Sequence, residues 1–220
     1  MQKETETWNE QMTDRQVVRY RVTVPRNLMR RIEQDRAVGH RLLMALLVPT
    51  ALDKSSPREA AKLLWAIVSP DELLVSSGVR LESTTDVAVE EVPFSPVFEQ
   101  EKDFRVEGMV EVSHTPTSRV PDEIWNLPNR PAIRNKRVPV PDEQVQDWLT
   151  KKLERSGLTI KSWKGVATKK FKARNLNLSG AQFSAVVNVI DADKANSALF
   201  QGFGRSKNFG CGLLQLEKIT

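Results

Sequence analysis

Two features of the sequence carry residues that could do chemistry, a histidine in the first third and a glycine-rich segment near the end. His40 is followed at i+3, i+4 and i+7 by the apolar residues Leu43, Met44 and Leu47. A histidine exchanges protons near neutrality because its ordinary pKa is about 6.5, so His40 is a candidate general acid or base. The same spacing fits a helix histidine that packs beside an apolar core, and from the residues alone this interpretation is favoured.

The glycine-rich segment, residues 201–214, reads QGFGRSKNFGCGLL. Its four glycines and two cations are Gly202, Gly204, Gly210, Gly212, Arg205 and Lys207. Glycine lets backbone amides approach a phosphate closely and adopts positive φ easily. A Rossmann fingerprint is excluded, because that loop follows a strand and opens a helix, whereas this segment is expected to follow a helix and open a strand. A phosphate cradle and a tight structural turn both stay open.

The positive charge of the chain is concentrated in one segment. The net charge is +5, with a pI of about 9.4. Residues 130–174 contain thirteen Lys or Arg and four Asp or Glu, a net charge of +9, so the rest of the chain sums to −4. A basic block on a near-neutral body is typical of a nucleic-acid binder, although an ordinary solvated face gives the same composition.

Composition excludes several other classes of protein. The 220 residues are 40% hydrophobic and 28% charged, which is typical of a globular protein. One cysteine and two histidines are too few for an intrachain disulfide or a Cys/His zinc site, so we expect no metal and no cofactor. Cys211, beside glycines and leucines, is expected to be a small buried residue. No apolar run approaches the about 20 residues of a membrane span, and residues 1–13 are polar, so we expect a cytoplasmic protein without membrane contact.

Periodicity predicts the elements that position these residues. Alternation of apolar residues predicts strands over 17–24, 60–69, 72–79, 104–113, 158–166, 183–190 and 213–216. Apolar stripes predict helices over 27–34, 36–48, 142–156 and 192–201. Asp35 and Asp191 are the expected caps of the second and fourth of these helices.

The order strand, helix, strand, strand, helix, strand is that of a ferredoxin-like unit. The sequence therefore predicts an α+β protein with two tandem ferredoxin-like (RRM-like) domains. The expected divisions are an N-terminal extension 1–16, a first domain 17–113, a linker 114–135 and a second domain 136–220.

Several stretches together resemble one known family. Residues 62–67 followed by 73–77 resemble its paired strands, and residues 135–140 followed by Trp148-Leu resemble its lysine-arginine-valine segment and Trp-Leu helix. The glycine-rich segment followed by two leucines is the most specific match. Over roughly residues 17–218 the chain resembles the CRISPR-associated CasE family, the endoribonuclease that matures CRISPR RNA in type I-E systems.

The resemblance implies a reaction and a set of partners. The family cleaves repeat RNA beside its hairpin without a metal ion, by attack of a ribose 2′-OH that leaves a 2′,3′-cyclic phosphate and a 5′-OH. His40 stands where the family keeps its catalytic histidine. The product would stay bound as the 3′ hairpin of the crRNA, and the chain would be a subunit of the complex called Cascade, in contact with other Cascade subunits.

The resemblance also implies that a basic face of the second domain holds the repeat hairpin. The expected RNA-binding residues are Lys136, Arg137, Lys169, Lys170, Lys172, Arg174, Arg205 and Lys207. For each of them an ordinary solvated side chain is the alternative interpretation.

One position departs from the family pattern. Ala37 stands three residues before the histidine, where the family usually carries a tyrosine, and the only tyrosine of the chain is Tyr20. This departure keeps open a subunit that holds the hairpin without cutting it. A generic RNA-binding protein outside CRISPR is a further alternative, which would bind unrelated stem-loops as tightly as a repeat hairpin.

Overall fold

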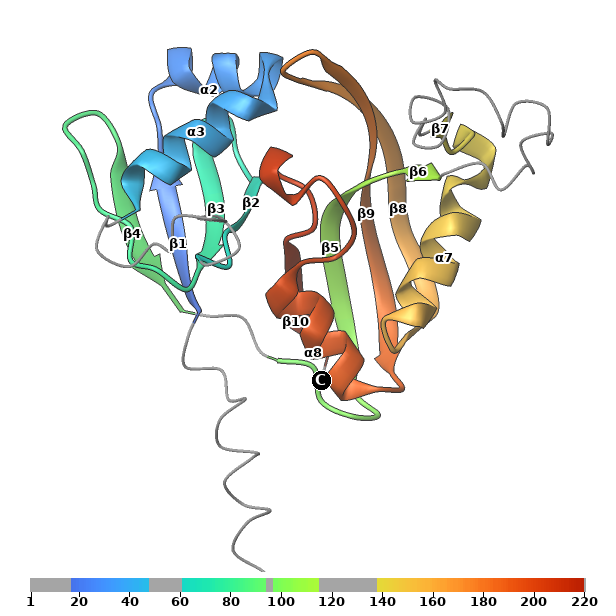
Figure 1. Ribbon diagram of the computed structural model, residues 1–220. Helices are drawn as coiled ribbons and strands as arrows, with labels where there is room; N and C mark the ends of the chain where they lie inside the picture. The colour runs from blue at the N-terminus through green and yellow to red at the C-terminus, as the bar shows by residue number, and fades with distance from the viewer. Residues whose placement is uncertain (1–16, 48–60, 94–96, 115–137, 220) are drawn as a thin grey trace, which may run out of the picture.

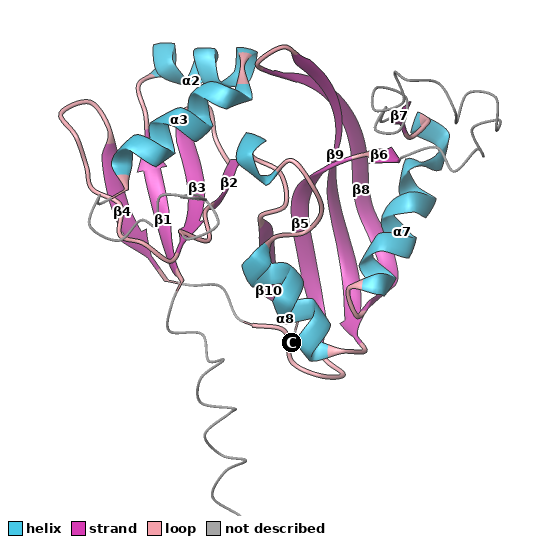
Figure 2. Cartoon of the chain, in the orientation of Figure 1, coloured by secondary structure: helices cyan, strands magenta, loops and turns pink. Residues whose placement is uncertain are grey.

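In a computed structural model the chain forms two four-stranded antiparallel sheets, each with two helices packed against it (Figures 1 and 2). The structure describes residues 17–47, 61–93, 97–114 and 138–219. The predicted extension 1–16 and all but the first residue of the predicted linker lie outside the described residues.

The first sheet has the strand order β2-β3-β1-β4. Its strands are β1 (Val18–Thr23), β2 (Leu64–Ile67), β3 (Glu72–Ser77) and β4 (Ala88–Val92). Its helices are α2 (Arg26–Gln34) and α3 (Arg36–Leu46). Ile32 of α2 and Leu43 of α3 are buried against Val22 in the core of this half. The strand order is ferredoxin-like, but residues 78–87, between β3 and β4, contain no helix.

The second sheet has the order β10-β5-β9-β8. Its strands are β5 (Asp103–Glu111), β8 (Leu158–Ala173), β9 (Leu176–Val189) and β10 (Leu214–Lys218). Its helices are α7 (Val145–Arg155), which follows the 3-10 turn η2 (Asp142–Gln144), and α8 (Ala192–Gln201). Two shorter strands pair with each other, β6 (Ser113–His114) and β7 (Val138–Pro139). This half is a complete ferredoxin-like unit, so the predicted fold class is confirmed.

One strand lies in the other half from the one expected. The sequence places the strand 104–113 in the first domain, but β5 pairs with β9 and β10 in the second sheet. The edge of the first sheet is instead formed by β4, which the sequence analysis did not predict. Glu90 and Glu91 interrupt the apolar alternation there, as charges on edge strands often do. The remaining domain boundaries stay predictions.

The β8–β9 hairpin is much longer than predicted. Strands expected over 158–166 and 183–190 extend to 158–173 and 176–189, with register irregularities near Ser162 and Gly165. The hairpin leaves the second sheet and arches over to α2 and α3 (Figure 1). Most residues of β8 after Val166 are exposed and polar, so no apolar alternation announces the strand. By contrast β2 is shorter than expected.

A buried arginine joins the two sheets. Arg19 of β1 is 2% exposed, and its Nη2 donates a 2.7 Å hydrogen bond to the carbonyl oxygen of Leu214, where β10 begins. Burial lowers the pKa of Arg19 to about 10, so it stays charged at neutral pH. Beside it Leu64 and Ala66 of β2 form a small apolar cluster with Leu213. The two halves therefore meet through the open face of the first sheet.

Substituting Arg19 tests this junction. We expect Arg19→Ala to lower the free energy of unfolding by about 2–3 kcal/mol, because a charge-assisted bond is lost and a buried carbonyl is left without its donor. Arg21→Ala is the matched control, since Arg21 lies two residues along the same strand, is exposed, and has ion pairs with Glu72 and Glu90 of 3.6 and 3.8 Å. We expect Arg21→Ala to lower the free energy of unfolding by only about 0.5 kcal/mol. Urea titration followed by tryptophan fluorescence measures both, and equal effects would contradict the junction.

Candidate functional site

The candidate catalytic residue lies on helix α3. Asp35 caps this helix as predicted, because its Oδ1 accepts a 2.9 Å hydrogen bond from the backbone N–H of Ala37. His40 is half-buried, one turn further along. Leu43, three residues later, is fully buried, which fits the expected packing of this helix. The structure thus places His40 beside the core while leaving part of its side chain accessible.

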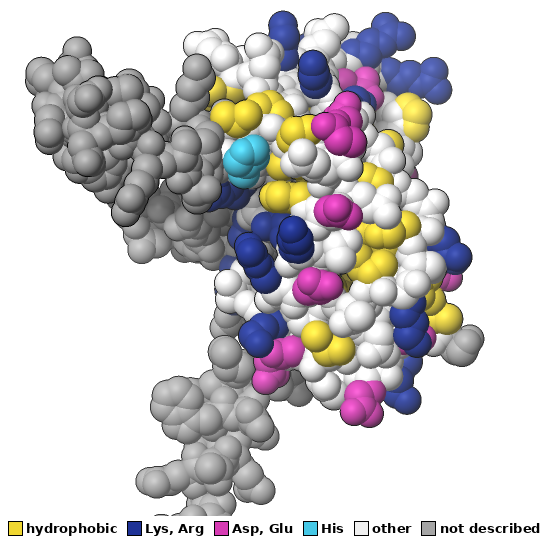
Figure 3. Space-filling model, turned by 90° about the vertical axis from the view of Figure 1, so that its right-hand side faces the viewer, with side chains coloured by type: hydrophobic (Ala, Val, Ile, Leu, Met, Phe, Trp, Pro, Cys, Tyr) yellow, Lys and Arg dark blue, Asp and Glu magenta, His cyan; other side chains and the backbone are white. Residues whose placement is uncertain are grey.

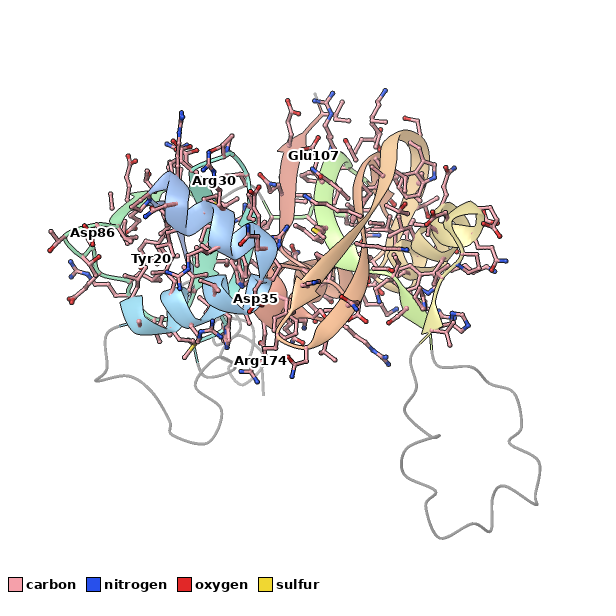
Figure 4. The ribbon with its side chains drawn as sticks, turned by 90° about the horizontal axis from the view of Figure 1, so that it is seen from above. Tyr20, Arg30, Asp35, Asp86, Glu107 and Arg174 are labelled. Carbon is pink, nitrogen blue, oxygen red and sulfur yellow. The ribbon has the colours of Figure 1, made fainter. Side chains whose placement is uncertain are left out.

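The tip of the β8–β9 hairpin is fastened to the start of the same helix. The backbone N–H of Arg174 donates a 2.8 Å hydrogen bond to Oδ1 of Asp35, the oxygen that also caps α3 (Figure 4). This bond from Arg174, then the cap bond and the nearby charges of Arg41 and Arg174, lowers the pKa of Asp35 despite some desolvation. The Asp35 carboxylate therefore caps the helix of His40 and also holds the tip of the β8–β9 hairpin, which we call the basic hairpin for the lysines and arginine near its tip.

The predicted basic residues of the hairpin are all exposed. They are Lys169, Lys170, Lys172 and Arg174. Phe171 and Ala173, which alternate with three of them, are buried. Because side chains alternate across a strand, Lys170 and Lys172 point to the opposite face of β8 from Phe171, and Lys169 shares its face. Lys and Arg side chains gather at the top of the molecule in Figure 3, the end at which this hairpin tip lies in Figure 1.

The glycine-rich segment forms a compact turn between α8 and β10. Its four glycines have φ between 71° and 88°. The turn is closed by a bond from Phe203 N to Gly212 O (2.8 Å), and Gly212 N bonds to Met109 O on β5 (2.7 Å). The interpretation as a tight structural turn is therefore supported, and phosphate binding by this loop stays a prediction.

This turn packs directly against α3. The loop includes the 3-10 helix η3 (Lys207–Phe209), and the indole Nε1 of Trp65 donates a 3.3 Å hydrogen bond to Asn208 O. A Cβ at Gly210 would lie 2.9 Å from the Trp65 ring, and one at Gly39 would lie 2.6 Å from the same ring. Since Gly39 precedes His40, the loop and the helix of His40 are held together by one tryptophan.

Arg36 occupies the centre of this contact. Its guanidinium lies 5.8 Å from the ring centroids of both Trp65 and Phe171, and the side chain is 5% exposed. Among the described residues its Nε and Nη1 have no hydrogen-bond partner. Burial lowers the pKa of Arg36, and the neighbouring Cys211 and Glu33 partly offset this effect. The site thus contains a buried cation one helical turn before His40.

A buried carboxylate bonds to the loop, and the loop itself contains a buried thiol. Glu111, 3% exposed, accepts hydrogen bonds from Ser113 (2.7 Å) and from Ser206, which has a positive φ of 56°. Cys211 is fully buried, as predicted, and burial raises its pKa to about 12. The thiol is therefore neutral at physiological pH and is no nucleophile.

Besides Arg36, sequence reasoning missed a second cation, Lys152. Its ammonium lies 5.2 Å from the ring of Trp148 and 5.3 Å from that of Phe203. It lies next to the glycine-rich loop, where Arg205 is exposed and Lys207 is half-buried. The spacing of four residues between Trp148 and Lys152 on a helix was the available signal.

The other residues singled out in the sequence lie on β6, in the first turn of α3 or outside the described residues. Lys136 and Arg137 fall outside the described ranges. His114 is exposed on β6, and Ala37 is 2% exposed in the first turn of α3. In the part of the chain that the structure describes, no three His, Cys, Asp or Glu side chains could together hold a metal ion. Within the same ranges no helix is long and apolar enough to cross a membrane.

Comparison with known proteins identifies the family. A family model described as CRISPR associated protein matches residues 12–218. The chain belongs to this CRISPR-associated family. The resemblance expected from the sequence is therefore confirmed at the level of the family. No curated protein sequence matches the chain at a significant level.

Solved structures share the fold of this CRISPR-associated chain. Cse3 of Thermus thermophilus, bound to an RNA representing a pre-cleavage complex, is 19% identical, with a TM-score of 0.72 over 92% of this chain and 99% of that one. Cas6e of Escherichia coli K-12 is 18% identical, with a TM-score of 0.63 over 91% and 99%. A chain of E. coli Cascade bound to a double-stranded DNA target is 16% identical, with a TM-score of 0.52 over 91% and 99%.

Removing the Asp35 carboxylate tests the link between hairpin and helix. We expect Asp35→Ala to lower the free energy of unfolding by about 1 kcal/mol through loss of the cap and to speed hydrogen exchange at the Arg174 amide. Asp191→Ala is the control, because the Asp191 carboxylate caps α8 through the backbone N–H of Lys194 and lies at the base of the hairpin rather than at its tip. Unchanged exchange at Arg174 in Asp35→Ala would contradict the link.

The buried charge of Arg36 leads to a second prediction, in which removing a charge does not lower stability. Arg36→Met keeps a long side chain between the two rings and removes a desolvated cation, so stability is expected to stay equal or rise by about 1 kcal/mol. Arg36→Ala leaves a cavity and is expected to lose about 2–4 kcal/mol. Thermal unfolding compares the two variants. A large loss in Arg36→Met would mean that the guanidinium has an anionic partner in the folded protein.

Proposed function

We propose that this protein is an endoribonuclease that cleaves CRISPR repeat RNA beside its hairpin and keeps the product hairpin bound. Membership of a CRISPR-associated family supports this proposal, as does the shared fold with Cse3 bound to RNA. The observation that carries it is the bond from Arg174 to Asp35, because it fastens a basic hairpin to the helix that carries His40.

The basic hairpin is the proposed contact for the RNA stem. A-form RNA is read mainly through its shape and phosphates, which suits lysines on both faces of β8. Lys169, Lys170, Lys172 and Arg174 would contact the stem, and Lys136 and Arg137 would form a second patch. Phosphate contacts make such binding strongly dependent on salt.

The proposed reaction needs no metal ion. The 2′-OH upstream of the scissile phosphate attacks phosphorus in line, the bond to the 5′-oxygen breaks, and the products are a 2′,3′-cyclic phosphate and a 5′-OH. The 2′-OH loses one proton and the leaving oxygen gains one. His40 would perform one of these two transfers, and the surrounding cations would hold the phosphate in line and stabilise its charge.

The proposed partners are the crRNA and the other subunits of Cascade. Among the chains that share this fold, one belongs to E. coli Cascade and another to a CRISPR RNA-guided surveillance complex. A protein that keeps its product hairpin would hold the 3′ end of the crRNA in such a complex. A cytoplasmic location follows from this role.

A subunit that holds the hairpin without cutting it is the second candidate. The observation that favours it is Ala37, which is 2% exposed and leaves the family's tyrosine position without a hydroxyl. A generic RNA-binding protein is the third, and competition between the repeat hairpin and an unrelated stem-loop separates it from the other two.

The experiment is cleavage of a cognate repeat RNA in EDTA under single-turnover conditions. Loss of acid–base catalysis in His40→Ala is expected to slow cleavage by about 10²- to 10⁴-fold, while the Kd for the RNA changes by less than about twofold. His114→Ala is the matched control, because it removes the only other histidine of the chain.

The outcomes separate the candidates. Cleavage by wild type and by His114→Ala, with binding but no cleavage by His40→Ala, supports the proposed reaction. Tight binding with no cleavage by any variant means a hairpin-holding subunit. Cleavage by His40→Ala at the wild-type rate would overturn the role of His40, and cleavage that EDTA abolishes would overturn the metal-independent reaction.

A further inference from the structure

Four cations meet where helix α7 passes the glycine-rich loop. Lys152 and Arg155 come from the last turns of α7, and Arg205 and Lys207 come from the loop. We call these four residues the loop cation cluster. Arg155 and Arg205 are exposed, whereas Lys152 and Lys207 are half-buried. The cluster is separate in sequence from the basic hairpin and joins two elements that are far apart in the sequence.

Lys152 is the fixed centre of this cluster. Its ammonium lies over the rings of Trp148 and Phe203, and its Nζ is 3.7 Å from the position that a Cβ on Gly204 would take. Burial, followed by the charges of Arg205, Arg155 and Lys207, lowers its pKa. Like charges held this close repel each other, and an anion among them would relieve the repulsion.

The loop is held in a defined position beside this cluster. Ser206, between the two cations of the loop, is bonded to the buried Glu111, and Lys207 Nζ donates to the carbonyl oxygen of Gln201 at 2.5 Å. The cations therefore project from a fixed backbone, so the anion that they fit is one of defined size and position. A phosphate with several oxygen atoms accepts from more than one of them at a time.

We propose that the loop cation cluster binds a phosphate of unpaired RNA, in the strand that leaves the hairpin at the cleavage point. This inference rests on the proposed function and adds a second contact region to it. The cluster adjoins the catalytic helix, because η3 packs on α3 beside Gly39 and Trp65. An RNA whose stem lies on the hairpin tip would thus pass His40 before it reaches the cluster.

The ring of Trp148 favours unpaired RNA over a second stem as the ligand of this cluster. Trp148 is half-buried: it packs against the core of the second half, and the Lys152 ammonium lies over its ring. Sites for single strands combine a positive groove with aromatic rings on which bases stack. A duplex turns its base faces inward and offers nothing to such a ring. The cluster with Trp148 therefore fits unpaired RNA better than a second stem.

The test compares two RNAs that cannot be cleaved. One is the repeat hairpin alone, and the other is the hairpin with its unpaired flanks, carrying a 2′-deoxy nucleotide before the scissile phosphate. We expect Lys152→Met to weaken binding of the flanked RNA severalfold and to leave binding of the hairpin alone unchanged. The slope of log K against log salt for the flanked RNA should fall by about 0.7, the value for one phosphate contact to a single strand.

Matched variants separate charge from packing. In Lys152→Met the apolar stem still packs against Trp148, but the charge is lost. Lys152→Arg keeps the charge and is expected to bind the flanked RNA as tightly as the wild type does. Lys151→Ala removes an exposed cation next to Lys152 on the same helix and is expected to affect neither RNA selectively. Between about 50 and about 200 mM salt, wild-type binding of the flanked RNA should weaken about threefold more than that of Lys152→Met.

The possible results distinguish this inference from the proposed function. If wild type prefers the repeat hairpin to an unrelated stem but Lys152→Met weakens both RNAs equally, or neither, the inference is overturned and the proposed function stands. If wild type shows no preference for the repeat hairpin, the proposed function fails and this inference fails with it. A selective loss for the flanked RNA that Lys152→Arg restores supports the inference.

Discussion

The guanidinium of Arg36 is stacked between Trp65, which belongs to the first sheet, and Phe171, which belongs to the second. The glycine-rich loop closes over it, because only a residue without a Cβ fits at position 210 beside that ring and that cation. Sheet, hairpin, helix and loop all contact this one side chain. His40 lies one helical turn after Arg36 on the same helix. The position of His40 therefore depends on these contacts of Arg36.

Much of the second half could be predicted from the sequence, because its core residues follow regular periods. The helix around Trp148 and the cap at Asp191 are visible in this way. Strand β4 could not be predicted, since its charged edge residues hide the apolar alternation. The assignment of β5 to the first domain was wrong, because alternation identifies a strand without identifying the strands that pair with it. Strand pairing is decided by contacts between distant segments, which local patterns do not contain.

In the candidate site, too, some residues could be found from local sequence patterns and others could not. His40, the cap Asp35 and the four glycines were found from the sequence, because helix signals, cap residues and glycine spacing are local. Lys152 and Arg36 were missed, because each looks in the sequence like an ordinary cation near a helix end. Their environments are created by residues of the loop and of β8 that come much later in the chain, so the burial of their charges is a property of the fold alone.

The contact between Trp65 and Asn208 spans 143 residues, and that between Arg19 and Leu214 spans 195. A ribosome adding about 5–20 residues per second needs about 7–30 seconds to pass from Trp65 to Asn208. During that time the first sheet can form while its tryptophan and Arg36 have no loop above them. The nascent chain therefore carries His40 long before it carries the loop that packs against the helix of His40.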